Sequence, residues 1–138
     1  MANNGSRVKS RKLPDQGRVA GRQTRVVSTD GHNPHFCLCN LSAGYRVSNC
    51  QQADRAAFAS WLDIRSQMTW LDLTLAPREG LGREKIPRGS IRPAIPTKIT
   101  PDVEHFLSFR FGDDARVIGY RTDEVFHIVW LDPNHDVY

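Results

Sequence analysis

The chain has 138 residues with a formal net charge of +4; 39% of them are hydrophobic and 25% charged. This length and composition indicate one globular domain with a single core. No run approaches the roughly 20 apolar residues of a membrane helix, and the N-terminus lacks the apolar stretch of a secretory signal. Three cysteines, an odd number, argue against a disulfide framework and predict a cytoplasmic protein.

The positive charge is concentrated near the N-terminus. Residues 1–30 contain seven basic and two acidic side chains, whereas the rest of the chain contains twelve and thirteen. Residues 1–34 lack aromatic side chains, and we interpret them as a basic, flexible arm that precedes a single α+β domain at 35–138. Such an arm either contacts RNA or ribosomal phosphates non-specifically or serves as a solubilising tail.

Residues 35–75 carry the first predicted elements. The pattern of 35–47 predicts a strand, a turn at Ser42–Gly44 and a second strand. A helix is predicted from about Gln51 to Met68, because apolar side chains recur at helical spacing on one face. That stripe consists of Ala57, Phe58, Trp61, Leu62, Ile64 and Met68. Residues 70–75 form a second short helix or a strand, which Pro77 ends.

Residues 77–101 predict a long cationic loop. The segment contains five prolines and three glycines, and loops of this length inside a domain are usually functional or mobile. Its basic side chains outnumber its acidic ones, which suits contact with phosphate groups. The residues that we assign to RNA binding are Arg83, Lys85, Arg88 and Arg92.

The stretch from 105 to 138 predicts an antiparallel meander, because three runs rich in β-branched and aromatic residues are separated by short polar turns. Alternation puts Leu107, Phe109 and Phe111 on one face of the first strand. On the second strand, Arg116, Ile118 and Tyr120 share a face. The third run is apolar on both faces, which is typical of a central, covered strand.

The cysteines and nearby histidines do not fit a zinc site well. Structural zinc usually takes pairs spaced C-x(2–4)-C, whereas Cys37 and Cys39 form a C-x-C pair without a second matched pair, and Cys50 stands alone. On a strand, this spacing puts both sulfurs on one face, where cysteine packs as a small hydrophobe. Nothing in the sequence marks an activated thiol. We expect no metal and no other cofactor.

A second set of residues suits RNA cleavage without a metal. It combines a carboxylate in the cationic loop, two arginines on successive strands, and a histidine and a phenol near the C-terminus. A base takes the 2′-OH proton, cations stabilise the charge on phosphorus, and an acid protonates the leaving 5′-oxygen. The candidate catalytic residues are Glu84, Arg110, Arg116, His135 and Tyr138. The alternatives are a solvated Glu84, an Arg116 paired with Asp113 or Asp114, and a packed terminal tyrosine.

The segment from about 50 to 138 resembles the RelE/YoeB family of bacterial toxin ribonucleases. The motif G-L-G-R-E-K-I-P is similar to the family's loop, F-R-F-G-D-D-A-R-V-I-G-Y to its strand–turn–strand, and D-P-N-H-D-V-Y to its terminus. The resemblance implies that Arg116 is the catalytic arginine and Arg110 the supporting one. It implies that Glu84 is the general base. It also implies that His135 and Tyr138 transfer protons and position the RNA base.

The predicted fold is a small antiparallel sheet, made of the C-terminal three-stranded meander and an N-terminal strand or hairpin. It packs against one or two helices, as in RelE. The resemblance implies a metal-independent mRNA endoribonuclease that works with the ribosome and is neutralised by a cognate antitoxin protein. A homodimer is left open, and no membrane contact is expected. The alternative is a non-catalytic module of a mobile element that binds RNA, the ribosome or another protein.

Overall fold

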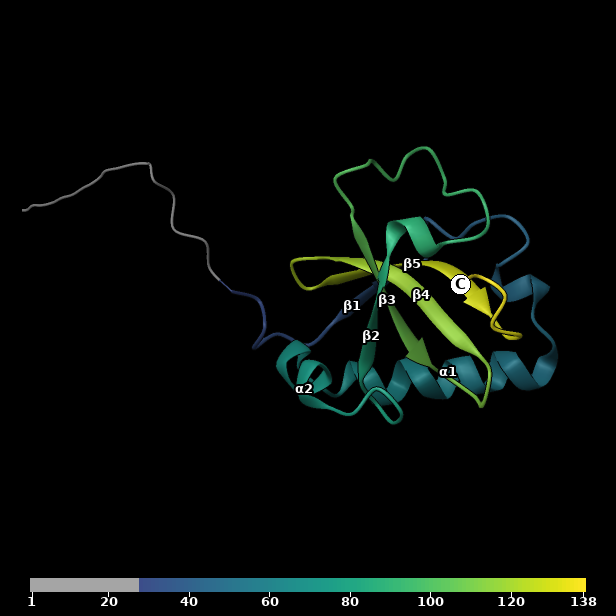
Figure 1. Ribbon diagram of the computed structural model, residues 1–138. Coiled ribbons are helices and arrows are strands. Elements are labelled where there is room, and N and C mark those ends of the chain that lie inside the picture. Colours follow the sequence, from purple (N-terminus) through teal and green to yellow (C-terminus); the bar gives the residue numbers. More distant parts are fainter. Residues whose placement is uncertain (1–27) are drawn as a thin grey trace, which may run out of the picture.

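The computed structural model describes residues 28–138, which form an α+β fold around one five-stranded mixed sheet (Figure 1). The strands are β1 (His35–Cys37), β2 (Arg83–Pro87), β3 (His105–Arg110), β4 (Arg116–Thr122) and β5 (Val125–Asp132). The helices are α1 (Gln52–Ser66), α2 (Trp70–Leu75) and two 3-10 turns at Val47–Asn49 and Arg88–Ser90. No helix in the described part of the chain is long and apolar enough to cross a membrane.

The sheet has the order β1-β5-β4-β3-β2. The predicted meander is present as β3, β4 and β5, which pair antiparallel in sequence order. The expectation of a purely antiparallel sheet is wrong, because β1 pairs with β5 in parallel. A parallel neighbour needs a long crossover connection, and the chain from β1 to β5 supplies it with the helices and three strands.

The side-chain alternation predicted for the meander is confirmed. Leu107, Phe109 and Phe111 point to the face of the sheet that α1 and α2 cover, where they join the aromatic core around Trp61. We call this the helix face. Ile118 and Tyr120 contribute to a second apolar cluster on the opposite face, which we call the outer face. The central strands are therefore buried on both sides.

Helix α1 begins and ends close to the predicted bounds, but its buried stripe differs at one position. Phe58 and Trp61 are buried as expected, whereas Ile64 is 46% exposed and Arg65 is buried in its place. The guanidinium of Arg65 lies 5.0 Å from the centre of the Trp61 ring, and it donates to the carbonyl of Arg110. Cation–π contact and this hydrogen bond offset the cost of burial, which lowers the pKa of Arg65 to about 10.

The predicted hairpin at 35–47 is wrong beyond its first strand. After β1 the chain runs beside β5 and makes two backbone hydrogen bonds to it, from Ser42 N to Val129 O and from Leu131 N to Tyr45 O. A turn with Gly44 at φ +85° separates these two contacts, and a β-bulge interrupts β5 between them. Because neither partner is regular here, no second ladder forms.

Residues 70–75 form a helix, so the choice left open by the sequence is settled. Thr69 caps it, since its hydroxyl accepts from the backbone N–H of Asp72 and the Asp72 carboxylate accepts from the N–H of Thr69. This reciprocal capping satisfies N–H groups that a short helix otherwise leaves unpaired.

Most of the predicted N-terminal arm, residues 1–27, lies outside the described residues. The last part, 28–34, contacts the fold. The carbonyls of Asp30 and His32 accept from the N–H groups of Leu71 and Trp70 in α2. The Asp30 carboxylate also pairs with Arg121 of β4 at 2.9 Å.

The predicted loop at 77–101 contains an additional strand. Residues 83–87 form β2, which pairs antiparallel with β3 along its whole length. The rest of the segment and its continuation to 104 cross the outer face and bury Ile99 there. The partly buried Ile91, Ile95 and Val103 pack against the same cluster. Figure 1 shows this green loop on the side of the sheet opposite α1. Helices thus cover one face, and a loop together with the C-terminal tail covers the other.

Close backbone approach at the bulge gives a stability prediction. A Cβ atom added to Gly119 would lie 2.0 Å from the carbonyl oxygen of His127, so the β4–β5 ladder would have to shift. We expect Gly119→Ala to lower the free energy of unfolding by about 3 kcal/mol, measured by urea denaturation with tryptophan fluorescence. Gly89→Ala is the matched control, because a Cβ there meets nothing within 4 Å; it should change stability by less than about 0.5 kcal/mol. Equal midpoints for the two variants would contradict this account.

Candidate active site on the outer face of the sheet

Strand register brings the loop carboxylate onto the outer face. Glu84 of β2 pairs with Ser108 of β3, which in turn pairs with Ile118 of β4. Directly opposed residues in an antiparallel pair point to the same face. Since Ile118 belongs to the outer cluster, Glu84 and Ser108 also face outward. Glu84 remains partly accessible, whereas Ser108 is only 3% exposed.

The C-terminal tail folds back over this part of the sheet. The carboxylate of Asp132 accepts hydrogen bonds from the N–H groups of Asp136 and Val137, both at 2.8 Å. His135, which lies between Asp132 and Asp136, has a left-handed backbone with φ +59°, and this conformation turns the chain back. The carbonyl of Val137 accepts from the N–H of Arg92 at 2.7 Å, and the Val137 side chain is fully buried in the outer cluster. This anchoring fixes the position of the residue that follows.

Tyr138 contacts both the hydroxyl of Ser108 and the carboxylate of Glu84. Its hydroxyl lies 2.8 Å from the hydroxyl of Ser108 and donates to Glu84 Oε1 at 3.5 Å. The His135 ring contacts the Tyr138 ring edge to face, with centroids 4.6 Å apart. The buried Nε2 of His135 has no hydrogen-bond partner among residues 28–138. Four polar side chains from β2, β3 and the C-terminal tail therefore form one connected group.

The two predicted arginines lie on the same face. Arg110 pairs with Arg116 across β3 and β4, two residues along from Ser108. Arg116 is 7% exposed, and its Nη1 donates to the carbonyls of Asp113 and Ala115 at 3.2 Å each. The alternative in which Arg116 pairs with a turn aspartate is therefore not observed. Within residues 28–138, neither arginine has a carboxylate oxygen within 4.0 Å.

A third arginine contacts the carboxylate itself. Arg78 Nη1 lies 3.2 Å from Glu84 Oε2, and Arg78 Nε lies 3.3 Å from Glu79 Oε2. The pKa of Glu79 is lowered mainly by its own backbone N–H, then by Arg78, with a smaller contribution from the charge of Arg110. Arg110 is thus close enough to act electrostatically on the turn that carries Arg78. Arg78 therefore links the carboxylates of Glu79 and Glu84.

The four residues assigned to RNA binding do not lie together. Arg83 and Lys85 pair with Phe109 and Leu107, so they leave β2 on the helix side, opposite to Glu84. The guanidinium of Arg88 donates to three backbone carbonyls between residues 99 and 103 and so holds the outer loop. Arg92 is exposed at the start of that loop. Arg83 and Lys85 thus lie on the helix side of β2, whereas Arg88 and Arg92 follow the strand and belong to the outer loop.

The cysteines do not belong to this group. Cys37 and Cys39 lie at the β1 edge of the sheet, four strands away from β2, and Cys50 is buried near the start of α1. Among residues 28–138, no cluster of three or more His, Cys, Asp or Glu side chains is arranged to hold a metal ion.

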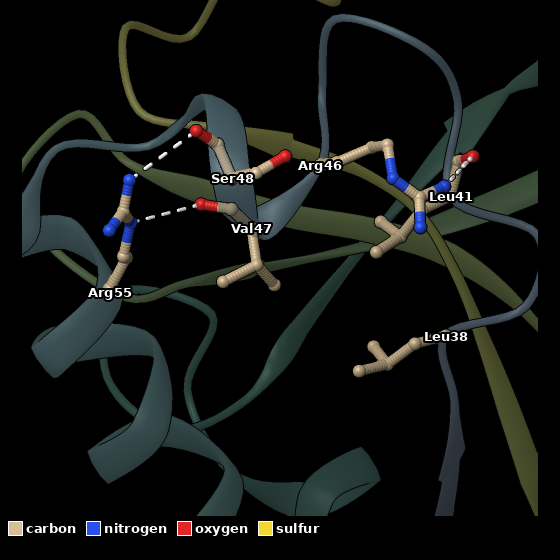
Figure 2. A pocket seen from close by; sticks show the side chains of 6 residues that line it. All are labelled: Leu38, Leu41, Arg46, Val47, Ser48 and Arg55. Carbon is tan, nitrogen blue, oxygen red and sulfur yellow. Dashed lines mark hydrogen bonds between the residues drawn. The ribbon is translucent and has the colours of Figure 1, made fainter.

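A separate cavity of about 420 Å³ lies between β1 and the start of α1. Figure 2 shows Leu38, Leu41 and Val47 between two arginines, Arg46 and Arg55. Both guanidinium groups are held by backbone carbonyls, Arg46 by Leu41 and Arg55 by residues 47, 48 and 50. The cavity is mainly apolar and contains none of the predicted catalytic residues.

Comparison of this chain with protein-family models, with curated proteins and with solved structures found no match.

Two members of the outer-face group were not predicted from the sequence. Ser108 is the polar residue inside the apolar run F-L-S-F, and a buried polar side chain in a strand signals either a partner or a role. Arg78 stands six residues before Glu84, and no regular period connects them. The turn at 77–82, closed by hydrogen bonds from the N–H groups of Gly80 and Gly82 to the carbonyl of Pro77, brings the two side chains together.

The hydrogen bond between Ser108 and Tyr138 can be measured by a double-mutant cycle. Tyr138→Phe leaves the buried Ser108 hydroxyl without its partner, so we expect a loss of about 1–2 kcal/mol in the free energy of unfolding. Ser108→Ala should cost a similar amount. Because the two changes remove the same bond, the double variant should cost less than the two single losses combined. Additive losses in urea denaturation would show that these hydroxyls do not interact.

Proposed function

We propose that this chain is a toxin-type, metal-independent endoribonuclease that cleaves mRNA in association with the ribosome and is neutralised by an antitoxin. The function rests on the resemblance of its motifs to the RelE/YoeB family and on one geometric observation. The Tyr138 hydroxyl connects Glu84 with Ser108, on the same sheet face as Arg110 and Arg116. Strand register adds the two arginines to this face, so the proposal requires that these groups contact one RNA phosphate together.

The proposed reaction is an internal transesterification. Glu84 accepts the proton of the ribose 2′-OH, and the 2′-oxygen attacks phosphorus. The bond from phosphorus to the 5′-oxygen breaks, and that oxygen takes a proton from Tyr138 or His135. The products are a 2′,3′-cyclic phosphate and a free 5′-OH. The contact of 3.5 Å between Tyr138 and Glu84 is long for a strong hydrogen bond, and it leaves room for substrate to separate these groups.

The arginines would stabilise the charge that develops on the non-bridging oxygens. Arg116 suits this role because two backbone carbonyls orient its buried guanidinium, and no carboxylate in residues 28–138 neutralises it. Electrostatic groups that are fixed before reaction need no reorganisation in the transition state. Arg110, half-buried beside it, would assist. Arg78 would hold the Glu84 carboxylate in place and release it when the RNA phosphate competes for the guanidinium.

One observation favours a second function. In this structure the Glu84 carboxylate is held by Arg78 at 3.2 Å, so it can serve as a structural anion rather than as a base. Arg110 and Arg116, which have no carboxylate partner among residues 28–138, would then bind a phosphate group without cleaving the RNA. Such a module would bind RNA with a steep dependence on salt concentration.

The test uses the full-length chain, purified and incubated with mRNA on translating ribosomes. We expect new 5′ ends and 2′,3′-cyclic phosphate termini with wild type. Arg116→Ala should reduce the cleavage rate by about 10²–10³-fold, because it removes transition-state charge stabilisation. Tyr138→Phe should reduce it by about 10²-fold or more if the phenol transfers a proton. Induced expression in a bacterial host should arrest growth with wild type and not with Arg116→Ala.

The matched control is Arg46→Ala, which removes an exposed arginine from the segment before α1 and should leave cleavage unchanged. Arg116 is buried, so circular dichroism and urea midpoints must show that its variant folds. Intact mRNA and normal growth with folded wild type would refute the nuclease. RNA binding without cleavage, weakened by Arg116→Ala, would support the binding module instead.

A further inference from the structure

Away from the candidate active site, β1 ends in a pair of thiols on the outer face of the sheet. Phe36 packs on Trp61 on the helix face, so the strand alternation turns Cys37 outward. Its neighbour on β5 is His127, whose own neighbour on β4 is Tyr120. The two rings stack with centroids 4.6 Å apart. Cys37, His127 and Tyr120 therefore form a row of side chains across β1, β5 and β4, and the thiol pair lies at the β1 end of this row.

The two sulfurs are close enough to react with each other. Cys37 Sγ and Cys39 Sγ lie 2.9 Å apart, within about 1 Å of the length of a disulfide bond. Both thiols are free; Cys39 is exposed and Cys37 is half-buried. Cys50 is buried elsewhere in the fold, near α1, and is not part of the pair. The backbone has already brought the two thiols together, so closing the bond orders little additional chain.

The surroundings favour one sulfur as the attacking thiolate. The hydrogen bond from Cys39 lowers the pKa of Cys37, the backbone N–H of Cys39 and the charge of Lys98 add to this, and burial opposes it. The same hydrogen bond raises the pKa of Cys39. In thiol–disulfide exchange the thiolate is the nucleophile, and a thiol with the lower pKa is ionised more often at neutral pH. Cys37 would attack first, and Cys39 would resolve the mixed disulfide.

The pair is open to solvent at the exposed Cys39, and a cavity lies next to two of its neighbours, Asn40 and Lys98. Lys98 Nζ donates to the Cys39 carbonyl at 3.2 Å. The Cys39 thiol donates to Asn40 Oδ1, and Asn40 Nδ2 donates to the Tyr120 hydroxyl. Asn40 and Lys98 also line a cavity of about 430 Å³ under the outer loop. The cation beside the opening suits a small anionic disulfide such as oxidised glutathione.

We propose that Cys37 and Cys39 form a thiol–disulfide exchange site that is oxidised reversibly by small disulfides. The Cys37 thiolate attacks one sulfur of the small disulfide, whose S–S bond breaks to release one thiolate. The Cys39 thiolate then attacks Cys37 Sγ in the mixed disulfide and releases the second. The protein loses two electrons and two protons, and the small disulfide is reduced to two thiols. Excess reduced thiol reverses both steps.

The test equilibrates the full-length, reduced chain with mixtures of oxidised and reduced glutathione, then traps free thiols with N-ethylmaleimide. We expect two of the three thiols to disappear together as the oxidised fraction rises, with peptide mapping that joins Cys37 to Cys39. Cys50 should be alkylated after denaturation at every ratio. Retention of all three thiols under oxidising mixtures, or a disulfide that includes Cys50, would overturn the proposal.

Variants separate the two sulfurs. Cys39→Ser should accumulate a stable glutathione adduct on Cys37, because no resolving thiol remains. Cys37→Ser should form its adduct on Cys39 more slowly, and Cys50→Ser should behave like wild type. Equal rates for the first two variants would remove the assigned order of attack. A Cys50→Ser chain that no longer forms the bond would overturn the site. Both the wild-type and Cys50→Ser measurements remain decisive if either single variant fails to fold.

Discussion

The two-sided burial of the central strands is the constraint on which the rest of the structure depends. Strands β4 and β5 present apolar side chains to both faces, and Trp130 and Ile118 on the outer face are as inaccessible as Val117 on the helix face. In this fold α1 and α2 both pack on the helix face. The outer face is instead covered by irregular chain, namely the loop up to residue 104 and the C-terminal tail. Because the C-terminal tail crosses the outer face, Tyr138 lies against the sheet and contacts Glu84 and Ser108.

Local periodicity predicted the fold where neighbours in sequence are neighbours in space. The meander and α1 follow directly from period two and period 3.6, since each buries one continuous set of side chains. At Ile64 and Arg65 the pattern was misleading. Periodicity assigned the aliphatic side chain to the core, but the aromatic surface of Trp61 and Phe109 offers a flat contact for a guanidinium. That preference depends on two elements that are far apart in sequence.

The candidate site was only partly predictable for the same reason. The five proposed residues could be chosen by chemical type, and the register across β2, β3 and β4 brings the carboxylate, serine and arginines onto one face. The strand β2 itself was missed, because its sequence R-E-K-I-P is charged and ends in proline. Such a strand is suited to the edge of a sheet, where charge and proline block further pairing. Without β2, the neighbour of Glu84 could not be identified.

The parallel pairing of β1 with β5 has a consequence for the order in which the fold assembles. The meander joins strands that follow one another in sequence, whereas His35 and Val125 are about 90 residues apart. Closing that loop costs chain entropy that only three register pairs repay, so we expect β1 to dock onto a sheet that has already formed. By the same reasoning β1 is the strand that opens most readily in the native state. Cys37 and Cys39 thus lie on the edge of the sheet that we expect to be held least firmly, where opening would expose the half-buried Cys37 beside the exposed Cys39.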